Sequence, residues 1–576
     1  MRPAKAGVVA ALAPAYTPRR PTETVLYGLV RQHLESFLAH ARENYDGGLP
    51  RYVEQELRGF LKCGVFSEGF TRARCDACGH DLLVAFSCHG RSICPSCCGR
   101  RMANGAAHLV DRVLPDVPVR QYVLSLPYEL RRLAAFKAEV LTALARTFVE
   151  ATFATYRARA KREGIDGAEC GSVLCVQRFG SLNLNVHFHV LVLDGVFARD
   201  PLGRAVFHPA PPPTIADLRA IVERTRRRAS AWLRRRGFLD VRALDERSQE
   251  PEAQTALDAC AAVAMGRGQV ATLARPGTAD AADEDHEQAP DKAAVAVDSE
   301  GFNLHAGVRI EAGDDLGRER LARYALRPPL SLERLRRLQS GRIAYRLKYV
   351  SRGRGKHRVM TPMEFMARLS AIIAPPRYPL VRYGGVLAPR SKWRSAVVPK
   401  PRERTGACAA AREDELTRAR RNARPEPQPA GEPARKAKPE QRASGDKAPP
   451  GVVAATPLEA PRPRSPVRPG DVIMLAPNIL SVQHWDRLLG GLLYATSPRV
   501  DWASLLRRSF SVDVLECPKC HGRLRVVAVI TEREPVRRIL SHLDMLTEAP
   551  PLSRARDPTD ELDGDPASVQ LGLDFA

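Results

Sequence analysis

The apolar run 184–193 is the clearest strand signal in the chain, with the sequence Leu-Asn-Val-His-Phe-His-Val-Leu-Val-Leu. It is too short and too rich in β-branched residues for a helix, so it predicts a buried strand. Because strand side chains alternate between faces, His187 and His189 should share one face, about 7 Å apart. One divalent cation would satisfy both imidazoles. The alternative is a pair of core histidines bonded to backbone or water.

Periodicity on both sides of this run alternates between strand and helix, which predicts an α+β fold. Strands are predicted at 119–126, 172–179, 301–310 and 342–349, and helices at 22–61 with a break at 47–50, 131–162, 215–237, 315–328 and 361–373. The strand 172–179 should turn into the histidine strand through residues 180–183. Gln177, near the end of that strand, is the nearest candidate for a third metal ligand, the alternative being a solvated side chain.

A cysteine-rich segment follows the N-terminal helices. Two Cys-x-x-Cys pairs are separated by fifteen residues: Cys75, Cys78, Cys94 and Cys97. Four thiolates at this spacing predict one tetrahedral structural zinc site in a small zinc-ribbon-like domain. Three more cysteines lie nearby and leave open a second ion or another choice of four ligands: Cys63, Cys88 and Cys98.

Composition divides the rest of the chain. Residues 245–300 turn to Ala, Asp, Glu, Gln and Gly, which predicts an insertion with a short helix at 252–265 and an acidic end. Residues 397–470 are rich in Pro, Arg, Ala, Glu and Lys, which predicts a disordered basic linker. The predicted parts are a helical segment 1–62, a zinc-binding domain 63–117, a sheet domain 118–396, the linker 397–470, and a C-terminal module 471–576 with an acidic tail.

The C-terminal module contains one further Cys-x-x-Cys pair, Cys517 and Cys520, at the tip of a predicted hairpin. No second pair follows it. The two cysteines therefore either take His521 or His542 as partners or bind no metal, and we favour the latter.

Charge and cysteine usage indicate the partner and the compartment. The net charge of +24 over 576 residues and the pI near 9.9 indicate a polyanionic partner, most simply nucleic acid. No apolar run has transmembrane length, so no membrane partner is expected. Closely spaced cysteine pairs are typical of metal sites in a reducing compartment, and we expect a cytoplasmic, nucleoid-associated protein.

The helix predicted after Asp314 carries Tyr324 among arginines. Arg320 precedes it by four residues and Arg327 follows it by three, so all three share one helix face, with Arg323 beside them. A tyrosine surrounded by guanidinium groups is placed to meet a phosphodiester, the alternative being a tyrosine packed at the helix edge. If the histidines hold a metal, Tyr324 becomes a nucleophile toward DNA phosphate.

Two further tyrosines are interpreted differently. Tyr345 and Tyr349 alternate with basic residues at strand spacing, and they are predicted to be packing residues.

His187-Phe188-His189 resembles the HUH motif of rolling-circle nucleases. Together with the cysteine-rich module and the segments 177–180 and 323–331, it resembles the rolling-circle transposases of the IS91 type, over about residues 63–393. The resemblance implies an antiparallel-sheet HUH nuclease fold, a magnesium or manganese ion held by the histidines, and a structural zinc. It also implies cleavage of single-stranded DNA at the ends of a mobile element, with Tyr324 forming a 5′-phosphotyrosine.

One position departs from the family pattern. Many members have a second tyrosine four residues before the first, and here that residue is Arg320, which implies the single-tyrosine branch. Strand exchange then requires a second protomer in a homodimer, sequential use of Tyr324, or a host hydroxyl. Competing interpretations are a plasmid replication initiator or relaxase, opposed by the absence of a Walker-type loop, and a non-catalytic zinc-ribbon protein that binds DNA.

Overall fold

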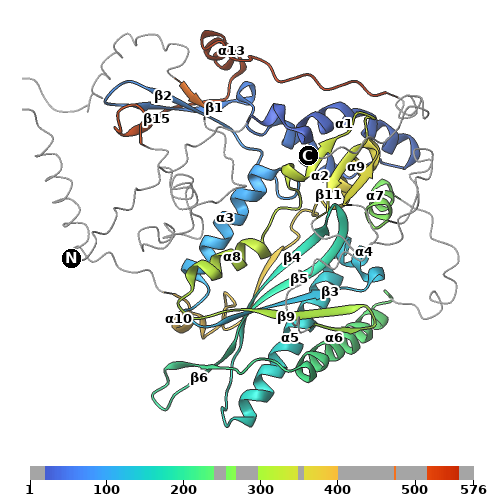
Figure 1. Ribbon diagram of the computed structural model, residues 1–576, viewed down its shortest axis with the longest axis vertical. Helices are drawn as coiled ribbons and strands as arrows, with labels where there is room; N and C mark the ends of the chain where they lie inside the picture. The colour runs from blue at the N-terminus through green and yellow to red at the C-terminus, as the bar shows by residue number, and fades with distance from the viewer. Residues whose placement is uncertain are drawn as a thin grey trace, which may run out of the picture. The chain divides into compact units, whose positions relative to one another are not determined.

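The histidine strand lies inside a six-stranded antiparallel sheet with the order β13-β4-β5-β3-β9-β8 (Figure 1). The strand bounds are Val119–Ser125 for β3, Gly171–Gly180 for β4, Asn183–Leu193 for β5, Ala296–Ser299 for β8, Phe302–Ile310 for β9 and Val381–Gly385 for β13. The predicted strand 184–193 is β5. β5 is buried almost throughout, and its backbone groups are paired by hydrogen bonds to β4 on one side and to β3 on the other.

The computed structural model describes residues 20–238, 255–266, 296–347, 356–399, 472–474 and 516–556. Helices and antiparallel strands together confirm the predicted α+β class. Most of the predicted linker 397–470 lies outside the described residues, as does Tyr349. The insertion 245–300 is described only in part. It contains the predicted short helix as α7, and it ends in β8, a strand that was not predicted.

The helices largely follow the predicted periodicity. Their bounds are α1 Val25–Asn44, α2 Arg51–Lys62, α3 Pro95–Arg112, α4 Tyr128–Phe136, α5 Ala138–Arg162, α6 Ile215–Arg235, α7 Ala256–Ala264, α8 Asp315–Ala325, α9 Pro362–Ala371, α10 Arg394–Val397 and α13 Arg533–His542. The prediction of one helix over 131–162 was wrong, because an extended Lys137 divides it into α4 and α5. Helix α3 was not predicted. Within the described residues, no helix is both long and apolar enough to cross a bilayer.

Each face of the sheet packs against its own helices. Phe188 and the other even-numbered residues of β5 pack with α5 and α6 in the larger core. Leu191 and Leu193 pack with α3 and α8 in a second core. Because His187 and His189 have the same parity as Leu191, strand alternation places them on the face that α3 and α8 cover.

A four-stranded sheet joins the zinc-binding region to the C-terminal module. Its order is β14-β2-β1-β15, with β1 Phe70–Cys75, β2 Asp81–Ala85, β14 Val472–Met474 and β15 Leu524–Ile530. Smaller sheets contain β6 Gly195–Arg199, β7 Ala205–Pro209, β10 Leu335–Arg337, β11 Ile343–Arg346 and β12 His357–Met360. Tyr345 in β11 is 1% exposed, as expected of a packing residue.

Candidate active site

His187 and His189 lie next to each other on one face of β5, with ring centroids 5.0 Å apart. Both side chains are buried. Strand pairing sets His187 between Gln177 of β4 and Ser125 of β3. The two histidines are therefore polar residues on an otherwise apolar face of β5. The residues opposite His187 on the neighbouring strands, Gln177 and Ser125, are polar as well.

The ring nitrogens of both histidines are suited to bind a metal. His187 Nδ1 donates to the carbonyl of Asn185 at 3.0 Å, which leaves the lone pair on Nε2. His189 Nδ1 lies 2.7 Å from the amide nitrogen of Gln121, and its buried Nε2 has no hydrogen-bond partner among the described residues. With the Gln121 amide turned to present its oxygen, Nδ1 donates and Nε2 can coordinate. A cation would satisfy this orphaned nitrogen.

Burial keeps both imidazoles uncharged. Desolvation lowers the pKa of His187 to about 4, and it holds the pKa of His189 well below its usual value. The positive charge of Arg327 acts in the same direction on both. Because metal ligation requires neutral imidazole, the pair is in the required form at neutral pH.

Helix α8 brings Tyr324 to the histidines. The side chain of Asp314 caps the start of the helix by accepting from the N–H of Gly317, and Tyr324 lies in its last turn. The Tyr324 ring is 5.4 Å from the His189 ring, in a perpendicular arrangement. The two histidines of β5 and a tyrosine remote from them in the sequence thus meet on one face of the sheet.

Gln177 points to the C-terminal end of α8. Its amide nitrogen donates to the backbone carbonyls of Tyr324 and Ala325, at 3.0 Å each. Its oxygen accepts from Nε of Arg327 at 3.2 Å. The prediction of Gln177 as third metal ligand was wrong for this arrangement, because the docked helix end engages both ends of the amide.

The three arginines predicted to contact DNA have different surroundings. The Arg327 guanidinium lies 5.0 Å from the Tyr324 ring centroid, and Arg320 is exposed. Arg323 is buried and donates to the Glu319 carboxylate at 2.8 and 3.1 Å. The prediction for Arg323 was wrong, because α8 turns that side chain toward the core. Arg320 and Arg327 stay candidates for DNA contact.

The four cysteines predicted to share one zinc ion belong to two clusters. The first consists of Cys63, Cys88, Cys94 and Cys97, and the second of Cys75, Cys78, Cys517 and Cys520. Within each cluster the sulfur atoms lie within 4.8 Å of one another. The single set was wrong because the hairpin β1–β2 separates its two halves. A strand of this length spans roughly 17 Å, too far for ligands of one ion.

Two family models match the sequence. The model described as "Putative transposase" matches residues 171–394, and the transposase zinc-binding domain of the IS91 type matches residues 29–126. The chain belongs to the IS91-type transposases. Neither the curated proteins nor the solved structures gave a match to it.

The two matches correspond to the two parts of the transposase described above. The first runs from β4 to α10 and contains both histidines and Tyr324. The second runs from α1 to the end of β3 and contains the first cysteine cluster together with Cys75 and Cys78. Neither match reaches Cys517 and Cys520 in the C-terminal module.

Helix α3 connects the zinc-binding domain of the transposase to the tyrosine helix. It begins at Pro95, directly after Cys94, so its first turn belongs to the first cysteine cluster. Its apolar residues pack with those of α8. A Cβ at Gly105 would lie 2.8 Å from Leu326 Cδ1, so glycine permits this close approach. The cluster therefore fixes the start of the helix against which α8 and Tyr324 are packed.

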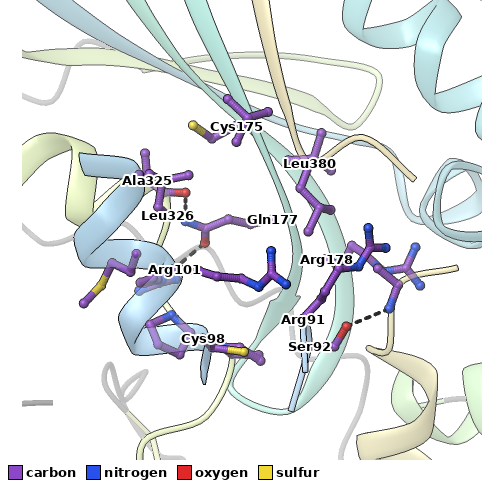
Figure 2. A pocket seen from close by; sticks show the side chains of 18 of the residues that line it. Arg91, Ser92, Cys98, Arg101, Cys175, Gln177, Arg178, Ala325, Leu326 and Leu380 are labelled. Carbon is purple, nitrogen blue, oxygen red and sulfur yellow. Dashed lines mark hydrogen bonds between the residues drawn. The ribbon is translucent and has the colours of Figure 1, made fainter. Parts of the chain in front are cut away.

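A cavity of about 310 Å³ lies beside this centre, between α3, β4 and the segment after α8 (Figure 2). Arg101 of α3 and Gln177 of β4 line it, as do Arg91 and Arg327. None of the described residues that line it is acidic. The cavity is therefore suited to a polar or anionic ligand next to the tyrosine site.

Two residues that shape the transposase site were not predicted from the sequence. Gln121 contacts His189, and its signal was a polar side chain within the predicted strand Val-Arg-Gln-Tyr-Val-Leu. Glu319 is fully buried and pairs with Arg323. Their spacing of four residues on a helix is typical of an ion pair, which could have indicated that Arg323 faces inward.

Proposed function

We propose that the transposase nicks and rejoins single-stranded DNA at the ends of a mobile element, through a 5′-phosphotyrosine at Tyr324. The convergence of Tyr324 with His187 and His189 supports the proposal most strongly. A packing tyrosine would not need two neutral histidines beside its ring. Nor would it need the Arg327 guanidinium over its ring, where that group can pair with a phosphate.

The chain's own residues account for cleavage and rejoining. Tyr324 Oη loses its proton and attacks the phosphorus, the bond from phosphorus to O3′ breaks, and a free 3′-hydroxyl leaves. The 5′ phosphate stays bound to the tyrosine. In the reverse step a 3′-hydroxyl attacks the phosphotyrosine and the phenol recovers its proton. One phosphodiester replaces another, so no nucleotide cofactor is consumed.

His187 and His189 would hold the divalent ion. A magnesium or manganese ion would act as a Lewis acid that binds and orients the scissile phosphate. The neutral imidazoles and the orphaned Nε2 of His189 fit such an ion. In the described part of the chain no third histidine, cysteine or carboxylate joins them, so water and phosphate oxygens would complete the coordination.

The basic cavity supports a single-stranded substrate. Lined by Arg91, Arg101 and Arg327, it offers positive charge beside the scissile phosphate, as the grooves that bind single-stranded DNA do. Since Arg320 replaces a second tyrosine, one centre holds one strand end covalently. Strand exchange would then use a homodimer or successive rounds at Tyr324, and the net charge of +24 favours residence on chromosomal DNA.

The test is formation of a covalent protein–DNA adduct. Labelled single-stranded oligonucleotides that contain the element ends are incubated with the protein and manganese, then separated under denaturing conditions. We expect an adduct with the native chain and none with Tyr324→Phe. Duplex DNA of the same sequence should give little adduct.

Tyr345→Phe is the matched control. This tyrosine is buried in β11, and its hydroxyl accepts from the N–H of Ser331 at 3.4 Å. The variant should form the adduct as the native chain does. Equal adduct formation by Tyr324→Phe would overturn the proposed nucleophile.

A further inference from the structure

The second cysteine cluster joins the zinc-binding region to the C-terminal module. Cys75 Sγ lies 3.5 Å from Cys520 Sγ, and Cys78 Sγ lies 3.5 Å from Cys517 Sγ. Four sulfurs placed tetrahedrally around zinc at about 2.3 Å are about 3.8 Å apart. The cluster therefore has the dimensions of a four-thiolate zinc site.

The two Cys-x-x-Cys turns have the same backbone hydrogen bonds. In each turn the N–H of the residue after the second cysteine donates to the carbonyl of the first cysteine. The N–H of the first cysteine donates to the carbonyl five residues on. The residue after the second cysteine has a positive φ in both turns, 72° at Gly79 and 56° at His521. Two facing turns of one kind, one at the end of the β1–β2 hairpin and one closed by the bridge between Glu516 and Arg523, have the architecture of a zinc ribbon.

Strand pairing brings the two turns together. β15 runs antiparallel to β1 from Phe70 opposite Ile530 to Cys75 opposite Leu524. At the end of this ladder a Cβ on Gly522 would lie 3.1 Å from Cys75 Sγ, so the second turn approaches the first closely. The register of the sheet, rather than a chance surface contact, therefore sets the cluster.

The ligands considered from the sequence do not complete a site with the C-terminal pair. His521 Nδ1 lies 2.7 Å from the Glu516 carboxylate and the side chain is exposed. Neither His521 nor His542 belongs to the cluster. The first cluster already has four sulfurs of its own, so Cys75 and Cys78 have no other cysteine partners in the described residues.

We propose that Cys75, Cys78, Cys517 and Cys520 hold a second structural zinc ion. The C-terminal module then completes the ribbon that begins at Cys75, and a folded protomer contains two ions. This replaces the favoured interpretation that Cys517 and Cys520 bind no metal. The proposal does not depend on the chemistry of Tyr324.

Zinc content and coordination of the purified full-length protein test this directly. Elemental analysis should give two zinc ions per chain, and X-ray absorption at the zinc edge should give four sulfur ligands per ion. Only seven cysteines lie between residues 63 and 98, so two separate four-sulfur sites need a contribution from elsewhere in the chain. One zinc per chain, or a mixed nitrogen and sulfur shell, would overturn the proposal.

A pair of variants locates the second site. Cys517→Ser with Cys520→Ser should retain one zinc with four sulfur ligands, held by the first cluster, which also reports that the N-terminal region is still folded. His521→Asn is the matched control, because asparagine tolerates the positive φ at that position, and it should keep two ions. Two ions in the double serine variant, or one in His521→Asn, would contradict the ligand set. If the double variant does not fold, the native zinc count and coordination still decide.

Discussion

Replacing Gln177 by glutamate separates two roles for this residue. If Gln177 were a metal ligand, a carboxylate would be a better ligand than an amide for magnesium or manganese, and metal affinity would rise. In the observed arrangement, glutamate loses both N–H donors and places negative oxygens against the carbonyls of Tyr324 and Ala325. We expect the second effect to dominate, with α8 docked less tightly.

The hydrogen bonds at Gln177 set the size of this effect. The side chain is 2% exposed, and each donated bond is 3.0 Å long. The Tyr324 carbonyl still accepts from the backbone N–H of Arg327 at 3.4 Å, so the Ala325 carbonyl is the acceptor that loses its donor. A buried acceptor left without a partner costs about 1–3 kcal/mol, and a charge-assisted bond from half-buried Arg327 returns about 1 kcal/mol. A net loss of about 1 kcal/mol lowers the thermal midpoint by roughly 2–4 °C in a domain of this size.

Two measurements with one control decide between the roles. Thermal unfolding is recorded with and without manganese, and the rate of adduct formation is measured over a manganese titration. Gln55→Glu makes the same substitution at an exposed position of α2 and should change neither. An unchanged midpoint in Gln177→Glu, with adduct formation at lower manganese, would refute the docking role and restore Gln177 as a ligand.

Two further predictions concern stability. Asp194 is fully buried and accepts from Arg120, Arg309 and Tyr156, so Asp194→Ala should cost about 3–5 kcal/mol by leaving buried Arg120 unpaired, measurable by urea unfolding. Without added metal, stability should fall as the pH drops from about 6.5 to about 4. In that window the unfolded chain binds a proton that folded His187, with its pKa of about 4, does not. In His187→Gln the free energy of unfolding should fall by about 3 kcal/mol less over this pH range. An unaltered slope of unfolding free energy against pH would contradict the burial of a neutral imidazole.

Local patterns predicted much of the sheet domain. The runs at 119–126, 172–179 and 184–193 became three adjacent strands, because their periodicity and β-branched content are local properties of the chain. The shared face of His187 and His189 followed from strand alternation alone. The break at Lys137 had no comparable signal, since neither proline nor glycine marks it.

The errors at the candidate site concern contacts between distant segments. Gln177 was interpreted from its place in a strand alone. Its amide is hydrogen-bonded to the end of a helix about 150 residues later in the chain. The cysteines were grouped by spacing, whereas strand pairing divided them. Arg323 was placed on an open helix face because the docking of α8 could not be inferred from its own sequence. Such contacts depend on tertiary packing, which periodicity does not encode.

The pairing of β1 with β15 has a consequence during synthesis. Cys78 and Cys517 are 439 positions apart, so at about 5–20 residues per second the first turn waits roughly 20–90 s for the second. In that interval the edge of β1 has no strand beside it, and two thiols stand open to oxidants. The histidines and Tyr324 have by then already left the ribosome. Closure of the ribbon thus marks the moment at which a newborn transposase has been translated past Cys520.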